Sequence, residues 1–229
     1  MLNLMAILQL SVCLSATVVE LCGPILPRNA QSIAKKALTA TTYQAVEDTF
    51  VVDWSGSSPL IRRHDQEREL VTSKGDVVPR RYVTYVKFAL APLGGRARVA
   101  KRATLRLKTV DPCDPHAIER EAAYGVHVVI EEWSAPRLDD SYLPSYEGSV
   151  DWQYPQRLLE GSWIEWDVTV ALRDQLEEVA QNGFAIDVDD NRIGHSYCVF
   201  QSSETSNPPE LLIEPEVALY MPALLATVR

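Results

Sequence analysis

The sequence lacks the short motifs that commonly mark an enzyme site. It contains no His-Glu-x-x-His zinc motif, no Gly-x-Ser-x-Gly nucleophile turn and no glycine-rich phosphate loop. Its four histidines are scattered without metal-ligand spacing. Carboxylates such as Glu131, Glu132 and Glu165 can in principle form a glycosidase pair, but nothing in the sequence indicates the defined separation that such a pair needs. We therefore predict a protein that is not an enzyme, with polysaccharide degradation as the less favoured alternative.

Basic residues are too few to indicate a nucleic-acid partner. The 229 residues hold 22 Lys and Arg against 31 Asp and Glu, a formal net charge of -9. Binding to a phosphate backbone depends on clustered Lys and Arg, and adsorption to anionic lipid needs the same charge. An acidic surface suits an exported protein or one that holds divalent cations. We expect neither a nucleic-acid nor a lipid partner.

The apolar run at the N-terminus is too short for a membrane span. Leu4–Val19 has the length of a signal-peptide core, and small residues at 15–17 and 29–30 offer cleavage positions. Because the first three residues include no Lys or Arg, the alternative is an N-terminal strand or helix buried in the fold. The chain is predicted to be secreted or held at the cell surface, with no membrane insertion after signal removal. Its predicted parts are a signal peptide (1–30), a leader (31–44), one domain (45–217) and a C-terminal tail (218–229).

Only two of the four cysteines fall in the predicted domain. Cys13 and Cys22 lie in or beside the predicted signal peptide, which leaves Cys113 and Cys198. Neither belongs to a Cys-x-x-Cys pair, so no zinc site is indicated. An even count in an exported chain allows a Cys113–Cys198 disulfide. Two buried free thiols remain the alternative, since a sequence does not give the distance between them.

From about residue 45 onward, apolar residues recur at every second position, which is typical of half-buried strands. The clearest runs are 82–90, 103–109, 126–130, 184–188, 197–203 and 210–214. The polar segment 54–81 is predicted to be a hairpin excursion on the surface. Many short strands with almost no helix predict an all-β sandwich or barrel.

One short helix is predicted between two of these strands. Thr169 can cap its N-terminus, and Asn182-Gly183 can stop the chain in a left-handed conformation. The helix is expected to be a crossover that plugs one end of the sandwich. Its apolar residues lie largely on one side, at Val170, Leu172, Leu176 and Val179.

A series of short motifs follows the order seen in one known family. They are Val46–Val51, Tyr85–Phe88, Ala103–Leu107, Glu131–Ser134, Trp163–Thr169, Asn182–Phe184, Phe200–Glu204 and Pro209–Leu211. Over residues 45–215 they resemble the DNRLRE domain, which is carbohydrate-binding module family 96 and is related to the disaggregatase repeat. The resemblance implies a jelly-roll β-sandwich on an exported bacterial or archaeal protein, and several members bind acidic polysaccharides. We therefore expect a non-catalytic extracellular module for an acidic polysaccharide, with a structural or adhesive part of a cell-surface assembly as the alternative.

The chain departs from the family pattern in several loops. The charged stretch Ile61–Val77 replaces the usual Asn-Tyr-Gly segment, and Lys87-Phe88-Ala89 stands where Arg-Phe-Asp is usual. The segments 111–120 and 136–155 are long loops in this interpretation. Because jelly rolls build binding sites from such loops, the resemblance does not identify the glycan.

Aromatic residues outside the strands are the candidates for stacking on a sugar ring. Trp133 and Trp166 are predicted to be core residues, because Trp133 ends a strand and Trp166 lies in a family motif that keeps an aromatic for packing. The alternative for the other aromatics is a long loop folded on its own rings. The predicted ligand-binding aromatics are Trp54, Tyr146, Trp152 and Tyr154.

Arg62 and Arg63 are the basic candidates for the same ligand. Their guanidinium groups can pair with uronate carboxylates in a bidentate geometry. A solvated loop whose acidic neighbours already satisfy the two arginines is the alternative.

Calcium is the ion that this acidic composition would favour. Asp48 and Glu204 occupy the two acidic motifs of the resemblance, on the first strand and near the last, which tend to meet in a jelly roll. We predict a structural calcium between them. The alternative is that turn and strand donors satisfy both carboxylates. Asp187, Asp189 and His127 alternate toward the polar faces of their strands and are expected to be exposed.

Overall fold

The structure is a computed structural model that describes residues 40–54, 63–75, 80–90, 100–113, 122–154, 160–177, 182–191 and 195–215. Alternating apolar and polar residues form strands in most of these segments, because alternation gives each strand one face to bury. The described residues form ten strands, β1 (Thr41–Trp54), β2 (Glu69–Gly75), β3 (Arg80–Phe88), β4 (Ala100–Lys108), β5 (Ala122–Val129), β6 (Tyr146–Gln153), β7 (Trp163–Asp167), β8 (Phe184–Asn191), β9 (His195–Gln201) and β10 (Glu210–Pro215). They also form the helix α3 (Thr169–Glu177) and a short 3-10 helix, η2 (Ala135–Arg137).

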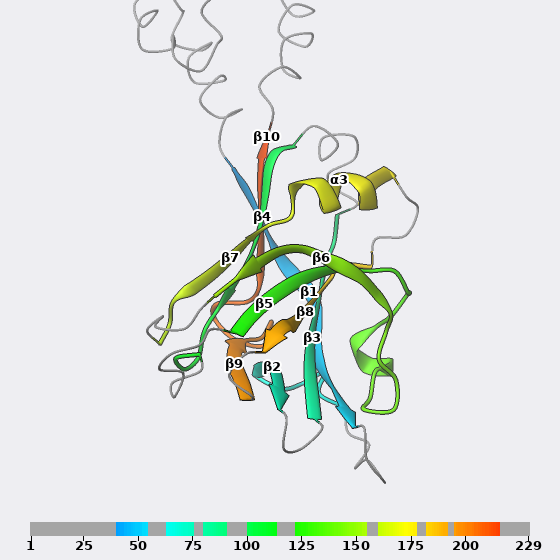
Figure 1. The fold of residues 1–229 in the computed structure, drawn as a ribbon. Coiled ribbons are helices and arrows are strands. Elements are labelled where there is room, and N and C mark those ends of the chain that lie inside the picture. The colour runs from blue at the N-terminus through cyan, green and yellow to red at the C-terminus, as the bar shows by residue number, and fades with distance from the viewer. Residues whose placement is uncertain are drawn as a thin grey trace, which may run out of the picture. The chain divides into compact units, whose positions relative to one another are not determined.

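The strands form two antiparallel sheets that share β1. Sheet A has the order β1-β10-β4-β7, and sheet B has the order β6-β5-β8-β3-β1. The strand order can be followed in Figure 1. The first residues of β1, 41–44, pair with β10, and 45–54 pair with β3. A register irregularity between Ala45 and Glu47 marks the place where β1 passes from one sheet to the other.

Eight of the strands have the connectivity of a jelly roll. Four strands, β1-β10-β4-β7, lie in sheet A, and β3-β8-β5-β6 lie in sheet B, while β2 and β9 pair with each other as an addition beside β3. The predicted all-β jelly-roll sandwich with one short helix is confirmed. All six predicted strand runs overlap observed strands, and β1 begins at Thr41, inside the predicted leader.

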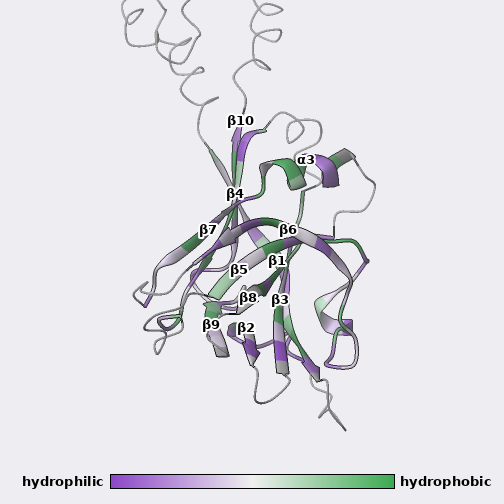
Figure 2. Cartoon of the chain, viewed as in Figure 1, coloured by the Kyte–Doolittle hydropathy of each residue, from purple (hydrophilic) through white to green (hydrophobic). Residues whose placement is uncertain are grey.

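The main core lies between the two sheets. Leu105 and Leu107 of β4 are fully buried, whereas Arg106 between them points to the opposite face and is partly exposed. Figure 2 shows the same mixture of hydrophobic and hydrophilic residues within single strands. Trp166 of β7 is 0% exposed, and its Nε1 donates a hydrogen bond of 2.9 Å to the Tyr124 carbonyl in sheet B. The predicted core position of Trp166 is confirmed, and removing such a ring costs about 3–5 kcal/mol.

A second apolar cluster covers part of the outer face of sheet B. The segment after β5 folds back so that Trp133 and Leu138 pack against Val83 and Tyr85 of β3. Trp133 is 4% exposed, meets Tyr85 edge-on, and donates its Nε1 hydrogen to the Asn182 carbonyl at 2.7 Å. Trp133 is therefore a core residue, as predicted, although its cluster lies outside the sandwich.

Helix α3 confirms the predicted crossover but differs in its capping and its buried face. Asp167 caps the helix, because its carboxylate accepts the Thr169 backbone N–H at 3.0 Å and the Thr169 hydroxyl at 2.6 Å. Leu172 is fully buried as predicted, but Val170 is 64% exposed, since the short helix packs only a narrow stripe on the sandwich. Val179 lies outside the described residues. Within the described part of the chain, no helix is long and apolar enough to cross a membrane.

The segment predicted as a surface excursion contains a buried strand. β2 pairs with β9 along its whole length, and Leu70 and Thr72 are 1% and 0% exposed. The prediction was wrong for these residues because Thr72 looks polar in the sequence, whereas its hydroxyl is hydrogen-bonded to Thr84 at 3.0 Å and to the Ile186 carbonyl at 3.3 Å. Tertiary partners thus allow a polar side chain in the interior.

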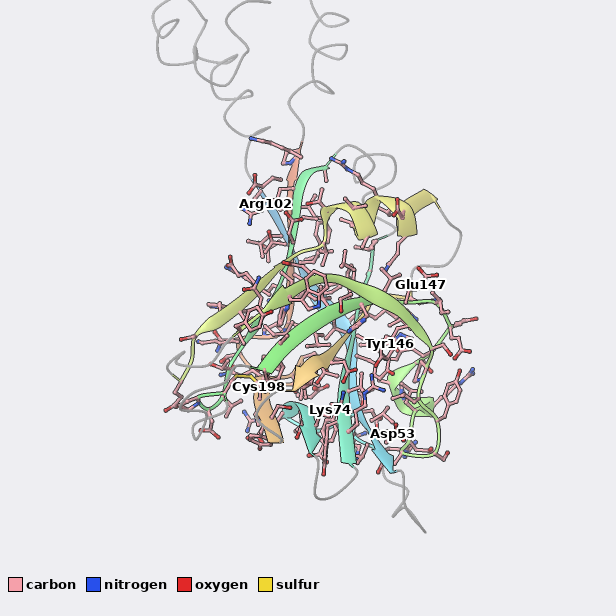
Figure 3. The ribbon with its side chains drawn as sticks, in the orientation of Figure 1. Asp53, Lys74, Arg102, Tyr146, Glu147 and Cys198 are labelled. Carbon is pink, nitrogen blue, oxygen red and sulfur yellow. A yellow bond between two sulfur atoms is a disulfide. The ribbon has the colours of Figure 1, made fainter. Side chains whose placement is uncertain are left out.

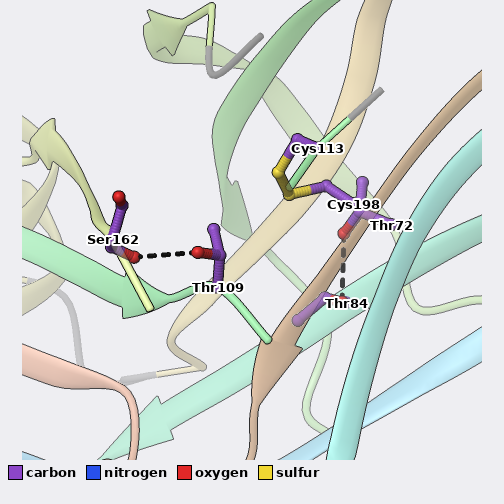
Figure 4. The surroundings of a disulfide bond; sticks show 6 residues. All are labelled: Thr72, Thr84, Thr109, Cys113, Ser162 and Cys198. Atoms are coloured by element: carbon purple, nitrogen blue, oxygen red, sulfur yellow. Dashed lines mark hydrogen bonds between the residues drawn. A yellow bond between two sulfur atoms is a disulfide. The ribbon is translucent and has the colours of Figure 1, made fainter. Parts of the chain in front are cut away.

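A disulfide joins the chain after β4 to β9. Cys113 and Cys198 are bonded, with their Cα atoms 4.5 Å apart and a separation of 85 positions in the sequence. Figure 4 shows the bond beside the Thr72–Thr84 hydrogen bond. The chain between β4 and Cys113 also pairs with β9, because Val110 donates its backbone N–H to Val199 at 2.9 Å. The disulfide therefore fastens the added β2–β9 pair to sheet A.

Candidate functional site

The edge strand β6 carries or adjoins three of the four predicted aromatic candidates. Tyr146 and Trp152 lie on β6, and Tyr154 follows its last residue. The prediction that 136–155 is a long loop was therefore wrong, because the glycine, serine and acidic residues of an exposed edge strand hide its alternation. Trp152 and Tyr154 are 49% and 55% exposed. Figure 3 labels Tyr146 on this strand.

Trp152 lies in a cross-strand row on the outer face of sheet B. It pairs with Gly125 of β5, which pairs with Asp187 of β8. Directly paired residues project to the same face of a sheet, and the neighbouring Tyr124 and Val188 point into the core instead. Gly125 therefore places no side chain between the indole of Trp152 and the carboxylate of Asp187.

A buried ion pair lies at the inner end of this row. Arg81 of β3 donates its Nε hydrogen to Asp187 at 3.0 Å, and its Nη2 contacts the second Asp187 oxygen. The Tyr146 hydroxyl donates to the same oxygen at 2.8 Å. The Asp187 side chain is 2% exposed and that of Arg81 is 34% exposed, and hydrogen bonding to Asp187 raises the pKa of Arg81 above its usual value. Arg81 therefore stays charged and held in place.

His127 lies beside this ion pair rather than in solvent. It is 5% exposed, and its ring centroid is 4.7 Å from that of Tyr146. Its Nδ1 is 2.9 Å from the Glu147 carbonyl, which can only accept, so Nδ1 carries the hydrogen and Nε2 faces the Ser149 hydroxyl at 3.4 Å. The expectation that His127 and Asp187 are exposed was wrong: both alternate to the outer face, where Tyr146 and neighbouring groups contact them.

The predicted ligand residues whose side chains the structure describes do not meet in one cluster. Arg63 is exposed and donates to the Pro136 carbonyl at 3.0 Å, beside η2. Trp54 ends β1 opposite Arg80, but its side chain and all of Arg62 lie outside the described residues. Tyr146 and Trp152 are six residues apart on β6, about 20 Å along a strand. Of the candidates whose side chains are described, Trp152 and Tyr154 are the exposed aromatic residues.

Asp48 and Glu204 do come together, through the serines between them. Asp48 is 3% exposed and accepts the Ser203 backbone N–H at 2.7 Å and its hydroxyl at 3.0 Å. Glu204 accepts the Ser202 hydroxyl at 2.8 Å. Burial, with the nearby charge of Glu204, raises the pKa of Asp48 from 3.8 to about 7, against the lowering effect of the Ser203 hydrogen bonds. Within the described residues, no group of three or more His, Cys, Asp or Glu is arranged to hold a metal ion.

A model of carbohydrate-binding module family 96 matches residues 39–215, which is more than half of the 229 residues. The chain belongs to carbohydrate-binding module family 96. The family 96 match includes every described strand from β1 to β10, so both sheets and the β6 surface fall within it. No curated protein matches the chain.

In this family 96 module, two of the carboxylates considered for glycosidase chemistry, Glu131 and Glu165, belong to different sheets or their connections. Glu131 follows β5 of sheet B, whereas Glu165 lies on the outer face of sheet A, paired with Arg106. Glu131 accepts hydrogen bonds from the Tyr142 hydroxyl at 2.5 Å and from the Ser145 backbone at 2.9 Å, and these lower its pKa. A carboxylate held in its charged form is poorly suited to be the general acid of a glycosidase.

Sequence reasoning missed Arg81 and the importance of Asp187. Arg81 lies 106 residues from Asp187 in the chain, and only the pairing of β3 with β8 brings them together. The alternation of β8 did place Asp187 on the outer face, which was the one available signal. A partner for it among the basic residues of 62–81 was not identifiable from spacing alone.

Proposed function

We propose that this family 96 module is a non-catalytic extracellular binder of an acidic polysaccharide, which it contacts on the outer face of sheet B around Trp152. The observation that carries the proposal is the row of Trp152, Gly125 and Asp187 across β6, β5 and β8. A half-exposed indole at a sheet edge offers an apolar face for the C–H face of a sugar ring. Gly125 places no side chain in the row but is itself buried, so a ligand would contact the row at Trp152 and at the partly exposed Arg81.

The acidic character of the ligand is supported by Arg81. Asp187 and Tyr146 engage its Nε and Nη2 atoms, so the Nη1 hydrogens stay outside these contacts. The carboxylate and the strand hold the guanidinium in one orientation, and a held guanidinium binds carboxylates at low entropic cost. Two strand spacings separate Trp152 from Asp187, about 10 Å, so a ligand that contacts both Trp152 and the Arg81 that Asp187 holds must be longer than one sugar ring.

Export is supported by the disulfide and by the N-terminal sequence. A Cys113–Cys198 bond persists in an oxidising compartment. The run Leu4–Val19 has the composition of a signal-peptide core. Both features suit a protein that acts outside the cell on polymers there.

A glycan array followed by calorimetry tests this function. We expect binding to uronate-containing polymers and a loss of about tenfold or more in affinity on Trp152→Ala, equivalent to about 1.4 kcal/mol. Tyr197→Ala is the matched control, because Tyr197 is also an exposed aromatic, at 40%, but lies on β9. It should bind as the parent protein does.

The same samples separate binding from catalysis. Long incubation with a bound polymer should release no new reducing ends and no unsaturated products. Turnover would support an enzyme instead. Failure to bind any glycan, together with tight binding to a protein, would support a structural or adhesive component.

A structural calcium at Asp48 and Glu204 stays a prediction. Its support is that the fold brings the two carboxylates to the same serine, Ser203, where two charges repel unless a cation or a proton lies between them. The hydrogen bonds from Ser202 and Ser203 are the competing explanation, since they satisfy several carboxylate oxygens without an ion.

Thermal melts with calcium and with chelator decide between these explanations. A site filled to about 100 times its dissociation constant stabilises the folded state by about 2.7 kcal/mol, so the midpoint should rise clearly with calcium. The rise should disappear in Asp48→Asn and Glu204→Gln. An unchanged midpoint, or the same rise in both variants, would show that no calcium binds there.

A further inference from the structure

The outer face of sheet A carries a second aromatic and polar surface that the β6 site does not use. Strand register places Lys108 of β4 directly opposite Trp163 of β7, and Arg106 opposite Glu165. All four project away from the core, because the alternate residues Leu107 and Ile164 are buried in it. We name Trp163, Arg106, Lys108, Asn207 and Gln201 the Trp163 surface.

Trp163 is held in a fixed orientation at the edge of its sheet. Its ring is half-buried, and the Arg106 guanidinium carbon lies 4.5 Å from the ring centroid. Glu210 holds that guanidinium in turn, accepting from Nε at 2.7 Å. An aromatic ring fixed in this way loses little conformational freedom when a ligand packs against it.

Lys108 supplies a positive charge beside the ring. Its ammonium donates to the Asn207 side-chain oxygen at 3.1 Å, and Asn207 donates to the Gln201 side-chain oxygen at 3.1 Å. This Asn207 contact is to a neutral amide, and among the residues that the structure describes no carboxylate forms an ion pair with Lys108, whereas Glu210 pairs with Arg106. An ammonium group next to an aromatic ring and two side-chain amides matches the carboxylate and hydroxyl groups of a uronate sugar.

The Trp163 surface repeats the composition of the β6 surface on the opposite face of the sandwich. Each has a tryptophan on the edge strand of its sheet and an arginine held by a carboxylate further inward, Arg81 with Asp187 and Arg106 with Glu210. The edge strands β6 and β7 adjoin, because the Asp167 backbone N–H donates to Asp151 at 2.8 Å. Resting on the function proposed above, we propose that the Trp163 surface is a second, independent binding site for a uronate chain, which makes the module bivalent.

Calorimetry with short oligosaccharides tests this proposal, because they are too short to span both faces. The probes are a galacturonate and a mannuronate tetrasaccharide. The parent protein should bind two per chain with at least one of them, and Trp163→Ala and Trp152→Ala should each bind one. Thr42→Ala is the matched control, since Thr42 is exposed on the same face of sheet A but lies on β1.

A second variant guards against loss of folding in Trp163→Ala. Lys108→Met keeps the aliphatic stem and removes the charge, and it should weaken one of the two sites by about tenfold while the other is unchanged. One site in the parent, with Trp163→Ala binding as the parent does, would overturn the second site and leave the proposed function intact. No binding of any uronate to the parent would overturn both.

Discussion

At the residue scale, tertiary contacts decide how the polar side chains of this module behave. Asp48, His127 and Asp187 are each 5% exposed or less, although their neighbours in the sequence are mostly those of surface strands. A hydrogen bond offsets the cost of burying each one: Asp48 bonds to Ser203, His127 to the Glu147 carbonyl, and Asp187 to Arg81. A buried polar group without such partners costs several kcal/mol, so these contacts specify the fold as well as stabilise it.

The raised pKa of Asp48 predicts how stability depends on pH. Folding raises this pKa from 3.8 to about 7, so the folded protein keeps a proton that the unfolded chain releases. The stabilisation that this proton gives the folded protein is complete below pH 4 and is lost as the pH rises through 7. Over that range the free energy of unfolding falls by up to about 1.4 kcal/mol per pH unit. Asp48→Asn should flatten this dependence in denaturant unfolding between pH 4 and 7, measured with chelator present.

A carboxylate on the surface gives the control for this measurement. Asp174 is exposed on α3. The free energy of unfolding of Asp174→Asn should therefore change with pH as steeply as that of the parent protein. If the free energy of unfolding changes equally steeply with pH in Asp48→Asn and in the parent protein, Asp48 is not the group that holds a proton in the folded state.

At the scale of elements, the edge strands and turns set what the two faces of the sandwich present. β6 and β7 are edge strands that each end a sheet, and both carry a tryptophan on the outer face. Edge strands tolerate polar residues and exposed rings because only one side of the strand is paired. The aromatic candidates therefore lie where a ligand can approach, although the alternation that identifies a strand is weakest there.

Gly183, at the start of β8, is a turn position that requires glycine. Its φ is +76°, and a Cβ added to it would lie 2.2 Å from the Val86 carbonyl oxygen. Gly183→Ala should therefore destabilise the fold by about 2 kcal/mol or more in denaturant unfolding. Gly148 of β6 is the matched control, because a Cβ there would have nothing within 4 Å. Gly148→Ala should change stability by about 0.5 kcal/mol or less, and equal effects at both positions would contradict the structure.

At the scale of the whole molecule, the disulfide and the shared strand β1 tie distant parts of the chain together. β1 joins the two sheets, and Cys113–Cys198 links sheet A to the added β2–β9 pair. Figure 3 places Arg102 of β4 at the opposite end of the domain from Lys74 of β2. Cys198 pairs with Thr72 of β2, so the disulfide acts directly on the added β2–β9 pair.

Removing the disulfide should lower stability substantially. A closed loop of 85 residues corresponds to about 4 kcal/mol in the chain-entropy model, so the Cys113→Ala, Cys198→Ala double variant should melt at a clearly lower temperature. Mass spectrometry of native protein should find no alkylatable thiol at either position before reduction. The same spectra should place the mature N-terminus between about residues 17 and 31. Two free thiols, or an intact Met1, would contradict the bond or the signal peptide respectively.

The strands were predictable from the sequence because they depend on local alternation, whereas the jelly roll and the buried ring of Trp166 were predicted from the resemblance to the family. Leu105 and Leu107 of β4 repeat at the period of a strand, and the motif around Trp166 carries a buried ring in the middle of another. The proximity of Asp48 and Glu204 also followed, since the first and last strands of a jelly roll meet. The strand positions need only the alternation of residues, whereas the meeting of Asp48 and Glu204 needs the jelly-roll order that the family resemblance implies.

The binding surfaces were decided by the tertiary structure. Which residue faces Trp152 depends on the register of β6 against β5, and Arg81 meets Asp187 only because β3 and β8 are neighbours. β2 became a buried strand because β9 pairs with it across more than a hundred residues of chain. Register and strand order arise from packing the whole core at once, and no local pattern in the sequence encodes them.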